Sequence, residues 1–163
     1  MVPDLDLQLQ AVIKALGDTV MPALDPANRV AAEQLSLSLA TLGMVRARLP
    51  LASRREWQEL QNMIGLGEAV AALGDFNALD AALADAAVVR DDANPQPFAR
   101  TKATRAIGAA TSAVVTAGAS DAVMRAVVTH SKPATDLSRA WSLPAGFEPD
   151  PDEVPALESL LGL

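Results

Sequence analysis

Residues 53–74 read SRREWQELQNMIGLGEAVAALG, and this stretch carries a complete set of helical signals. Ser53 and Glu56 have the spacing of a capping box, in which each side chain binds a free amide at the helix start. Gly74 is typical of a helix end. The apolar residues between them recur every three or four positions and share one face: Trp57, Leu60, Ile64, Gly67 and Ala71. The sequence therefore predicts an amphipathic helix over about 53–74.

Two helices are expected before this stretch. The first starts at Asp4 or Asp6 and ends at Pro22, because proline ends or kinks a helix. Its apolar face repeats at helical spacing: Leu9, Ile13, Leu16 and Val20. The second has Asp25 as its cap and Pro26 at its first position, and Pro50 closes it after Leu49.

Further helices are expected after it. Asp75 is predicted to cap a helix that reaches the polar loop 91–97, and another helix runs from Phe98 to Ala117. Ser120 is predicted to cap a helix that Pro133 ends, and a short turn of helix follows it. A last helix is expected near 155–161.

These signals predict an all-α protein. No stretch shows strand periodicity bounded by hairpin turns, and 33 alanines and 22 leucines among 163 residues suit closely packed helices. Short connections favour antiparallel neighbours. We therefore expect an Ala/Leu-rich antiparallel bundle of about six or seven helices over 1–142. An acidic, proline-rich tail over 143–163 ends in a short helix, which is expected to pack on the bundle or on a neighbouring subunit.

The composition excludes several classes of chemistry. The chain has no cysteine and one histidine, so it cannot form a disulfide, a Cys zinc site or a two-His metal site. Its formal net charge is −7, and an acidic chain is a poor binder of nucleic acid. It has no apolar run of about 20 residues and no export signal. We expect a cytoplasmic protein without metal, cofactor, nucleic acid or membrane.

Small residues at helical spacing leave two interpretations open. Gly65 and Gly67 each cost a helix about 0.5–1 kcal/mol, so a crossing helix, a kink or a ligand is expected to use the missing side chain. Alanines spaced four apart predict either ordinary close packing or a seam where another helix docks: Ala78, Ala82 and Ala86, then Ala109, Ala113 and Ala117.

Clustered cations are the main electrostatic feature. Arg46 and Arg48 suit a helix end, whereas Arg54 and Arg55 fall in a first helical turn, where the dipole favours anions. Arg100, Lys102 and Arg105 repeat this pattern near the start of another helix. These helix starts are candidate sites for a phosphate or carboxylate, and solvated basic patches are the alternative.

Two other candidates remain. His130 is expected near a helix end, where a cation interacts favourably with the helix dipole, and it is the sole obvious group for acid–base chemistry at neutral pH. Leu157, Leu160 and Leu161 share one helical face, which is typical of a helix that binds in a groove. The tail carries five acids and no base, and it is expected to lie across a basic patch.

No catalytic set emerges, and two functional hypotheses follow. The first is a non-enzymatic helical protein that self-associates, as a homodimer, or serves as an accessory subunit. The second is a small-molecule-binding domain or cofactor-independent enzyme that holds an anionic ligand at the arginine-rich helix starts.

Overall fold

The computed structural model describes residues 4–163. Every regular element in this range is helical, so the prediction of an all-α protein is confirmed. The chain divides into two compact units. The first holds the residues up to Ala52 together with Leu143–Glu148, and the second holds Ser53–Ser142 with Pro149–Leu163.

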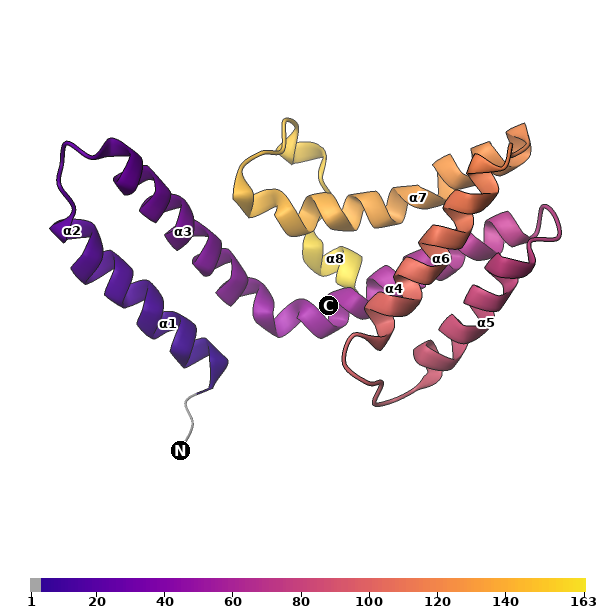
Figure 1. Ribbon diagram of the computed structural model, residues 1–163, viewed down its shortest axis with the longest axis horizontal. Helices are drawn as coiled ribbons and strands as arrows, with labels where there is room; N and C mark the ends of the chain where they lie inside the picture. The colour runs from indigo at the N-terminus through magenta and orange to yellow at the C-terminus, as the bar shows by residue number, and fades with distance from the viewer. Residues whose placement is uncertain (1–3) are drawn as a thin grey trace. The chain divides into compact units, whose positions relative to one another are not determined.

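The first unit is a helical hairpin. Helix α1 (Leu5–Ala15) continues through a π-helical turn (Leu16–Val20) into α2 (Met21–Ala23), and α3 (Arg29–Arg48) returns antiparallel beside α1 (Figure 1). Short 3-10 turns at Leu49–Leu51 and Leu143–Ala145 complete the unit, and the second of them contacts α3.

The second unit is a bundle of four longer helices and a short tail helix. These are α4 (Ala52–Ala71), α5 (Asn77–Asp91), α6 (Ala99–Thr116), α7 (Asp121–Ser142) and α8 (Leu157–Leu161). A 3-10 turn at Pro151–Glu153 precedes α8. Helices α5 and α6 lie side by side and antiparallel, joined by the loop that follows Asp91 (Figure 1).

The hydrophobic core lies inside this second unit. All four longer helices contribute buried residues: Leu60, Ile64, Leu66, Val70, Leu79, Ala86, Ala103, Ile107 and Val123. The predicted face of the 53–74 helix is buried at Leu60, Ile64 and Gly67, as its spacing required. This core is a contiguous cluster, which is what one domain of this size needs to fold.

Gly67 is the glycine of α4 that side chains of other helices approach closely. A Cβ atom built there would lie 2.9 Å from Ile107 Cγ2 of α6 and 2.9 Å from Leu83 Cδ2 of α5. A Cβ atom built at Gly65 would have no neighbour within 4 Å, and Gly65 is exposed. Of the uses considered for the two glycines, the structure shows a crossing of helices at Gly67.

Several predicted helix starts are wrong in detail. Asp25 accepts a bond from the Ala27 amide at 2.9 Å, but α3 begins three residues later, with Asn28 accepting from the Ala31 amide at 3.1 Å. Both are Asx-type contacts, and a cap and a loop turn use the same chemistry. Asp75 does not cap α5, because Phe76 is the N-cap residue and no side chain binds there.

The capping box at Ser53 and Glu56 is also absent. Helix α4 already begins at Ala52, directly after the 3-10 turn, whose Leu49 carbonyl accepts the Ala52 amide. Because the preceding turn is itself helical, α4 needs no side-chain cap. The Ser53 hydroxyl instead accepts a bond of 3.2 Å from Nη1 of Arg100.

Pro22 lies after the π-helical turn, and α2 ends one residue later at Ala23, so the prediction that this proline ends or kinks the first helix is confirmed to within one residue. Pro133, in contrast, does not end its helix as predicted. Pro133 lies inside α7, which continues to Ser142. Proline removes one backbone bond, but α7 buries Val123 before it and Leu137 and Ala140 after it, and this burial holds the helix together.

The two glycines of α4 make a matched pair for a stability test. We expect Gly67→Ala to lower the free energy of unfolding by about 1–3 kcal/mol, because its methyl group overpacks a filled core. Gly65→Ala should raise it by about 0.5–1 kcal/mol, because alanine is the better helix former in open space. Urea unfolding measures both, and equal stability of Gly67→Ala and wild type would contradict the close crossing.

Candidate functional site

The hairpin of the first unit has no core of its own. No residue of α1, α2 or α3 is buried. A two-point ion pair joins the start of α1 to the end of α3: Nε and Nη2 of Arg46 donate to the Asp6 carboxylate at 2.6 and 3.0 Å. These bonds lower the pKa of Asp6. An exposed ion pair adds little stability. This one therefore specifies how α1 and α3 align and contributes little to the free energy of unfolding.

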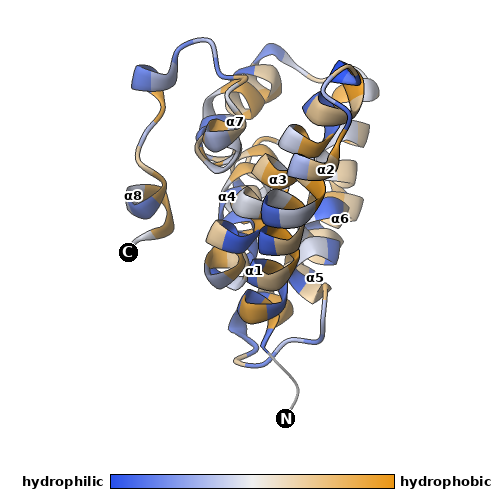
Figure 2. Cartoon of the chain, turned by 90° about the vertical axis from the view of Figure 1, so that its left-hand side faces the viewer, coloured by the Kyte–Doolittle hydropathy of each residue, from blue (hydrophilic) through white to orange (hydrophobic). Residues whose placement is uncertain are grey.

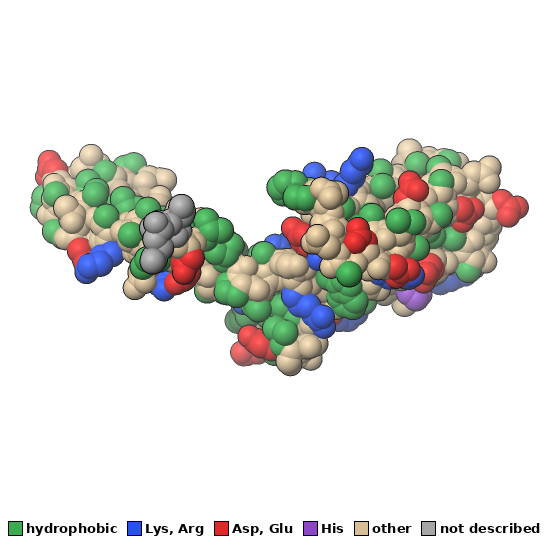
Figure 3. All heavy atoms as spheres, turned by 90° about the horizontal axis from the view of Figure 1, so that it is seen from below, with side chains coloured by type: hydrophobic (Ala, Val, Ile, Leu, Met, Phe, Trp, Pro, Cys, Tyr) green, Lys and Arg blue, Asp and Glu red, His purple; other side chains and the backbone are tan. Residues whose placement is uncertain are grey.

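Large apolar side chains remain exposed on both helices of this hairpin. Those exposed in α1, its π-helical turn and α3 are called the hairpin surface: Leu5, Leu7, Val12, Val20, Val30, Leu37 and Val45. Val30 is 69% exposed and Leu5 is 63% exposed. Apolar residues appear as orange segments along α1 and α3 in Figure 2 and as green patches in Figure 3.

Helix α3 is apolar on two opposite sides. Leu35, Leu39 and Leu42 follow one helical stripe and are half-buried. Leu37 and Val30, seven residues apart, lie on the other side and are exposed. An apolar side of a helix normally packs against another element. The sequence signal for the second side is the run from Gln34 to Val45, which has no charged residue.

Arg54 and Arg55 make contacts within the second unit. Nε of Arg54 donates to the Leu161 carbonyl of α8 at 2.7 Å. Nε of Arg55 donates to Glu59 one turn later at 2.7 Å. Arg55 also lies over the ring of Trp141, 4.4 Å from its centroid. The anion-binding role predicted for these arginines stays a prediction, and the contacts that the structure records for them are structural.

The other predicted cations are spread over the chain. Arg46 and Arg48 occupy the last turn of α3. Lys102 and Arg105 are exposed on α6. Arg100 is half-buried and lines a polar cavity of ≈ 240 Å³. This polar cavity lies between the start of α6, which contributes Arg100, and the start of α4, which contributes Ser53 and Glu56.

His130 is not at a helix end. Because α7 continues to Ser142, His130 lies in its middle, and the expected interaction with the C-terminal dipole is absent. Its side chain is exposed, and it is the purple group in Figure 3. No acid–base partner for it is seen among the described residues.

The tail leucines lie on helix α8, which contacts α7 within the second unit. Leu157 and Leu161 are buried and Leu160 is half-buried. The tail acids Asp150, Asp152, Glu153 and Glu158 are exposed instead. Gly162 adopts a left-handed conformation with φ of 66°, and a Cβ atom there would lie 3.1 Å from Nη2 of Arg54. Arg54 therefore binds the backbone carbonyl of Leu161 at the end of α8, and α8 is held in the second unit by its buried leucines.

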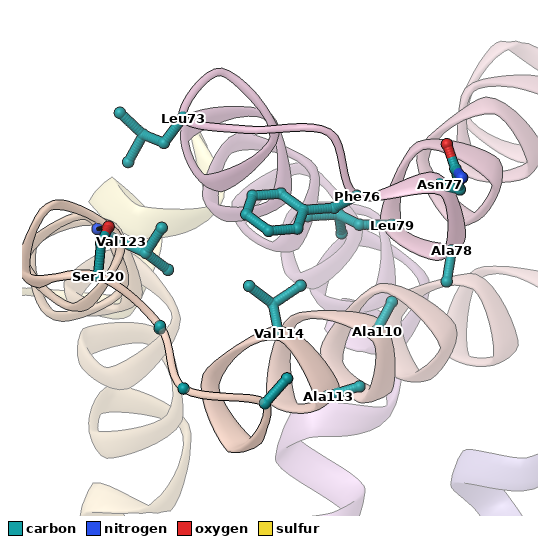
Figure 4. Close-up of a pocket in the computed structure, with 13 residues that line it drawn as sticks. Leu73, Phe76, Asn77, Ala78, Leu79, Ala110, Ala113, Val114, Ser120 and Val123 are labelled. Carbon is teal, nitrogen blue, oxygen red and sulfur yellow. Dashed lines mark hydrogen bonds between the residues drawn. The ribbon is translucent and has the colours of Figure 1, made fainter.

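An apolar pocket lies at one end of the second unit. It encloses ≈ 550 Å³ between the α4–α5 turn, the end of α6 and the start of α7. The ring of Phe76 extends into it near Val114 and Val123 (Figure 4). Ala78, Ala113 and Ala117, three of the alanines spaced four apart, line this pocket. Their small side chains leave it open. Ala82 and Ala86 pack into the core instead.

This pocket offers no catalytic group. None of its lining residues is charged, and the Ser120 hydroxyl caps α7 by accepting from the Val123 amide at 3.4 Å. Its size and lining suit an uncharged apolar molecule.

No metal-binding cluster occurs among the described residues. In the loop after α5, Asp91 accepts from Arg90 at 2.8 Å and Asp92 accepts from the Asn94 amide at 2.8 Å. No helix within residues 4–163 is both long and apolar enough to cross a membrane. The cytoplasmic location stays a prediction.

The chain matches no known protein family, no curated protein and no solved structure.

The bond from Arg54 to the tail can be tested by mutation. We expect Arg54→Ala to lower the free energy of unfolding by about 1 kcal/mol, because one charge-assisted hydrogen bond is lost. For a chain of this size that corresponds to a melting temperature lower by about 2–4 °C. Proteolysis after residue 148 should become faster. Lys102→Ala removes the same charge from an exposed site and should leave both measurements unchanged.

Proposed function

We propose that this chain is a non-enzymatic helical protein that acts by association, and that a partner binds at the hairpin surface. The observation that carries this proposal is that no residue of α1, α2 or α3 is buried, while apolar residues such as Val30 and Leu37 stay exposed. Apolar side chains that repeat on one side of a helix, as Val30 and Leu37 do on α3, are typical of a side that packs against another element.

The energetic argument concerns the hairpin itself. Helices gain most of their stability in proteins from packing of an apolar face, and short isolated helices are marginal in water. Fully burying one Val or Leu side chain contributes about 1.5–3 kcal/mol. The second unit gains this from its core, whereas the hairpin leaves its second stripe uncovered. A partner that covers this stripe would supply the missing stabilisation.

Hydrogen exchange in a double variant, Val30→Glu with Leu37→Glu, tests whether the hairpin depends on a partner. If a partner covers these positions, the charges displace it, and amides of α1 and α3 should exchange at least about 10-fold faster than in wild type. Amides of α4 and α6 near Leu60 and Ile107 should be unchanged. Val88→Glu on α5, where the wild-type side chain is 73% exposed, is the matched control and should change neither unit.

The outcomes separate clearly. Rapid exchange of α1 and α3 already in the wild-type chain also supports the proposal, since it shows a hairpin whose partner is missing from the sample. Slow exchange that the double variant leaves unchanged would show a hairpin that is stable by itself, and the proposal would then be wrong.

A second candidate function is the binding of an anionic small molecule beside Arg100. Nε of Arg100 is buried without an acceptor, while its Nη1 donates to Ser53 across the polar cavity. A guanidinium group binds oxyanions strongly. Glu56 lines the same cavity, and its charge disfavours ligands with several negative charges.

Inorganic phosphate is the probe for this second candidate. We expect millimolar phosphate to raise the melting temperature of wild type and to have no such effect on Arg100→Ala, because a ligand stabilises the state that binds it. Arg125→Ala, which removes an exposed cation of α7, should respond like wild type. An equal response of Arg100→Ala would rule out this site.

A further inference from the structure

We propose that the partner of the hairpin surface is a second copy of this chain, and that two hairpins related by a two-fold axis form a four-helix bundle. This inference rests on the proposed function and names its partner. Pairing two hairpins is the smallest symmetric arrangement that gives each helix a second neighbour.

The first argument is the charge pattern of α3. A residue that lies close to a two-fold axis meets its own counterpart, so a charge there would face the same charge. The twelve residues from Gln34 to Val45 include no charged residue, and Leu37 and Thr41 stand one turn apart near their middle. The charges of α3 stand towards its ends, at Arg29, Glu33, Arg46 and Arg48. The centre of α3 can therefore face itself without repulsion.

The second argument is the charge of the hairpin as a whole. Residues 4–52 carry five acidic and four basic side chains, whereas the acidity of the chain is concentrated in the rest of it. A nearly neutral, apolar surface is complementary to another of the same kind. It would not select a strongly charged partner.

The third argument is the amount of apolar surface. A stable interface covers about 800 Å² on each partner. Val30, Leu37 and Val45 are exposed on one side of α3 at spacings of seven and eight residues, and they would form the apolar centre of such an interface. Burial in the pair would also cover both stripes of α3, which a hairpin alone cannot do.

The absence of cysteine makes this inference directly testable in the full chain. A single introduced cysteine can form a disulfide only with another copy. We expect mild oxidation to link Leu37→Cys or Thr41→Cys into a covalent pair that reduction reverses, because helices in contact bring facing Cβ atoms within disulfide reach. Ala84→Cys, at an exposed site on α5, should stay unlinked.

Light scattering gives the second readout. The wild-type chain should have twice the mass of one chain, and Leu37→Glu should weaken pairing at least about 100-fold, because two charges enter an apolar contact. A single-chain mass at all concentrations, a larger assembly, or linkage at Ala84→Cys alone would overturn the inference. The hydrogen-exchange experiment still decides the proposed function in that case: rapid exchange of α1 and α3 in a monomer points to a different partner, and slow exchange rejects both.

Discussion

The close approach of side chains to the backbone of α4 at Gly67 is the constraint on which the second unit depends. Because no side chain stands there, Ile107 of α6 and Leu83 of α5 both reach the surface of α4. The three helices then share one layer of buried residues, with Leu60 and Leu79 completely covered. In a chain with so few aromatic residues, contact between helices replaces bulk as the source of packing.

Part of this arrangement follows from the sequence. The spacing of Leu60, Ile64 and Gly67 predicts which face of α4 is buried, and this face is observed. The cost of glycine in a helix predicts that something uses Gly67, but Gly65 has the same cost and no close neighbour. The local pattern therefore predicts which face of α4 is buried. It does not predict which glycine is needed, because Leu83 and Ile107, which approach Gly67, come from distant parts of the chain.

The failed predictions share one physical cause. Asp25, Asp75 and Ser53 are all capable of capping a helix, but a capping side chain works only where a helix begins. The start of α4 is fixed by the preceding 3-10 turn, and the continuation of α7 past Pro133 is supported by Leu137 and Ala140 on its far side. Tertiary burial outweighs local signals in such cases. The arginines illustrate the same limit, since Arg54 is occupied by the carbonyl of a residue more than one hundred positions away.

The placement of the two tryptophans has a consequence for spectroscopy. The Arg54 guanidinium lies over the ring of Trp57, 4.9 Å from its centroid, and that of Arg55 lies over Trp141 at 4.4 Å, so each indole contacts one of two neighbouring cations. The chain has no other tryptophan and no tyrosine. Its intrinsic fluorescence therefore reports on the start of α4 and the end of α7. The hairpin of α1 and α3 contains no tryptophan or tyrosine, so its melting or assembly can leave the intrinsic fluorescence unchanged.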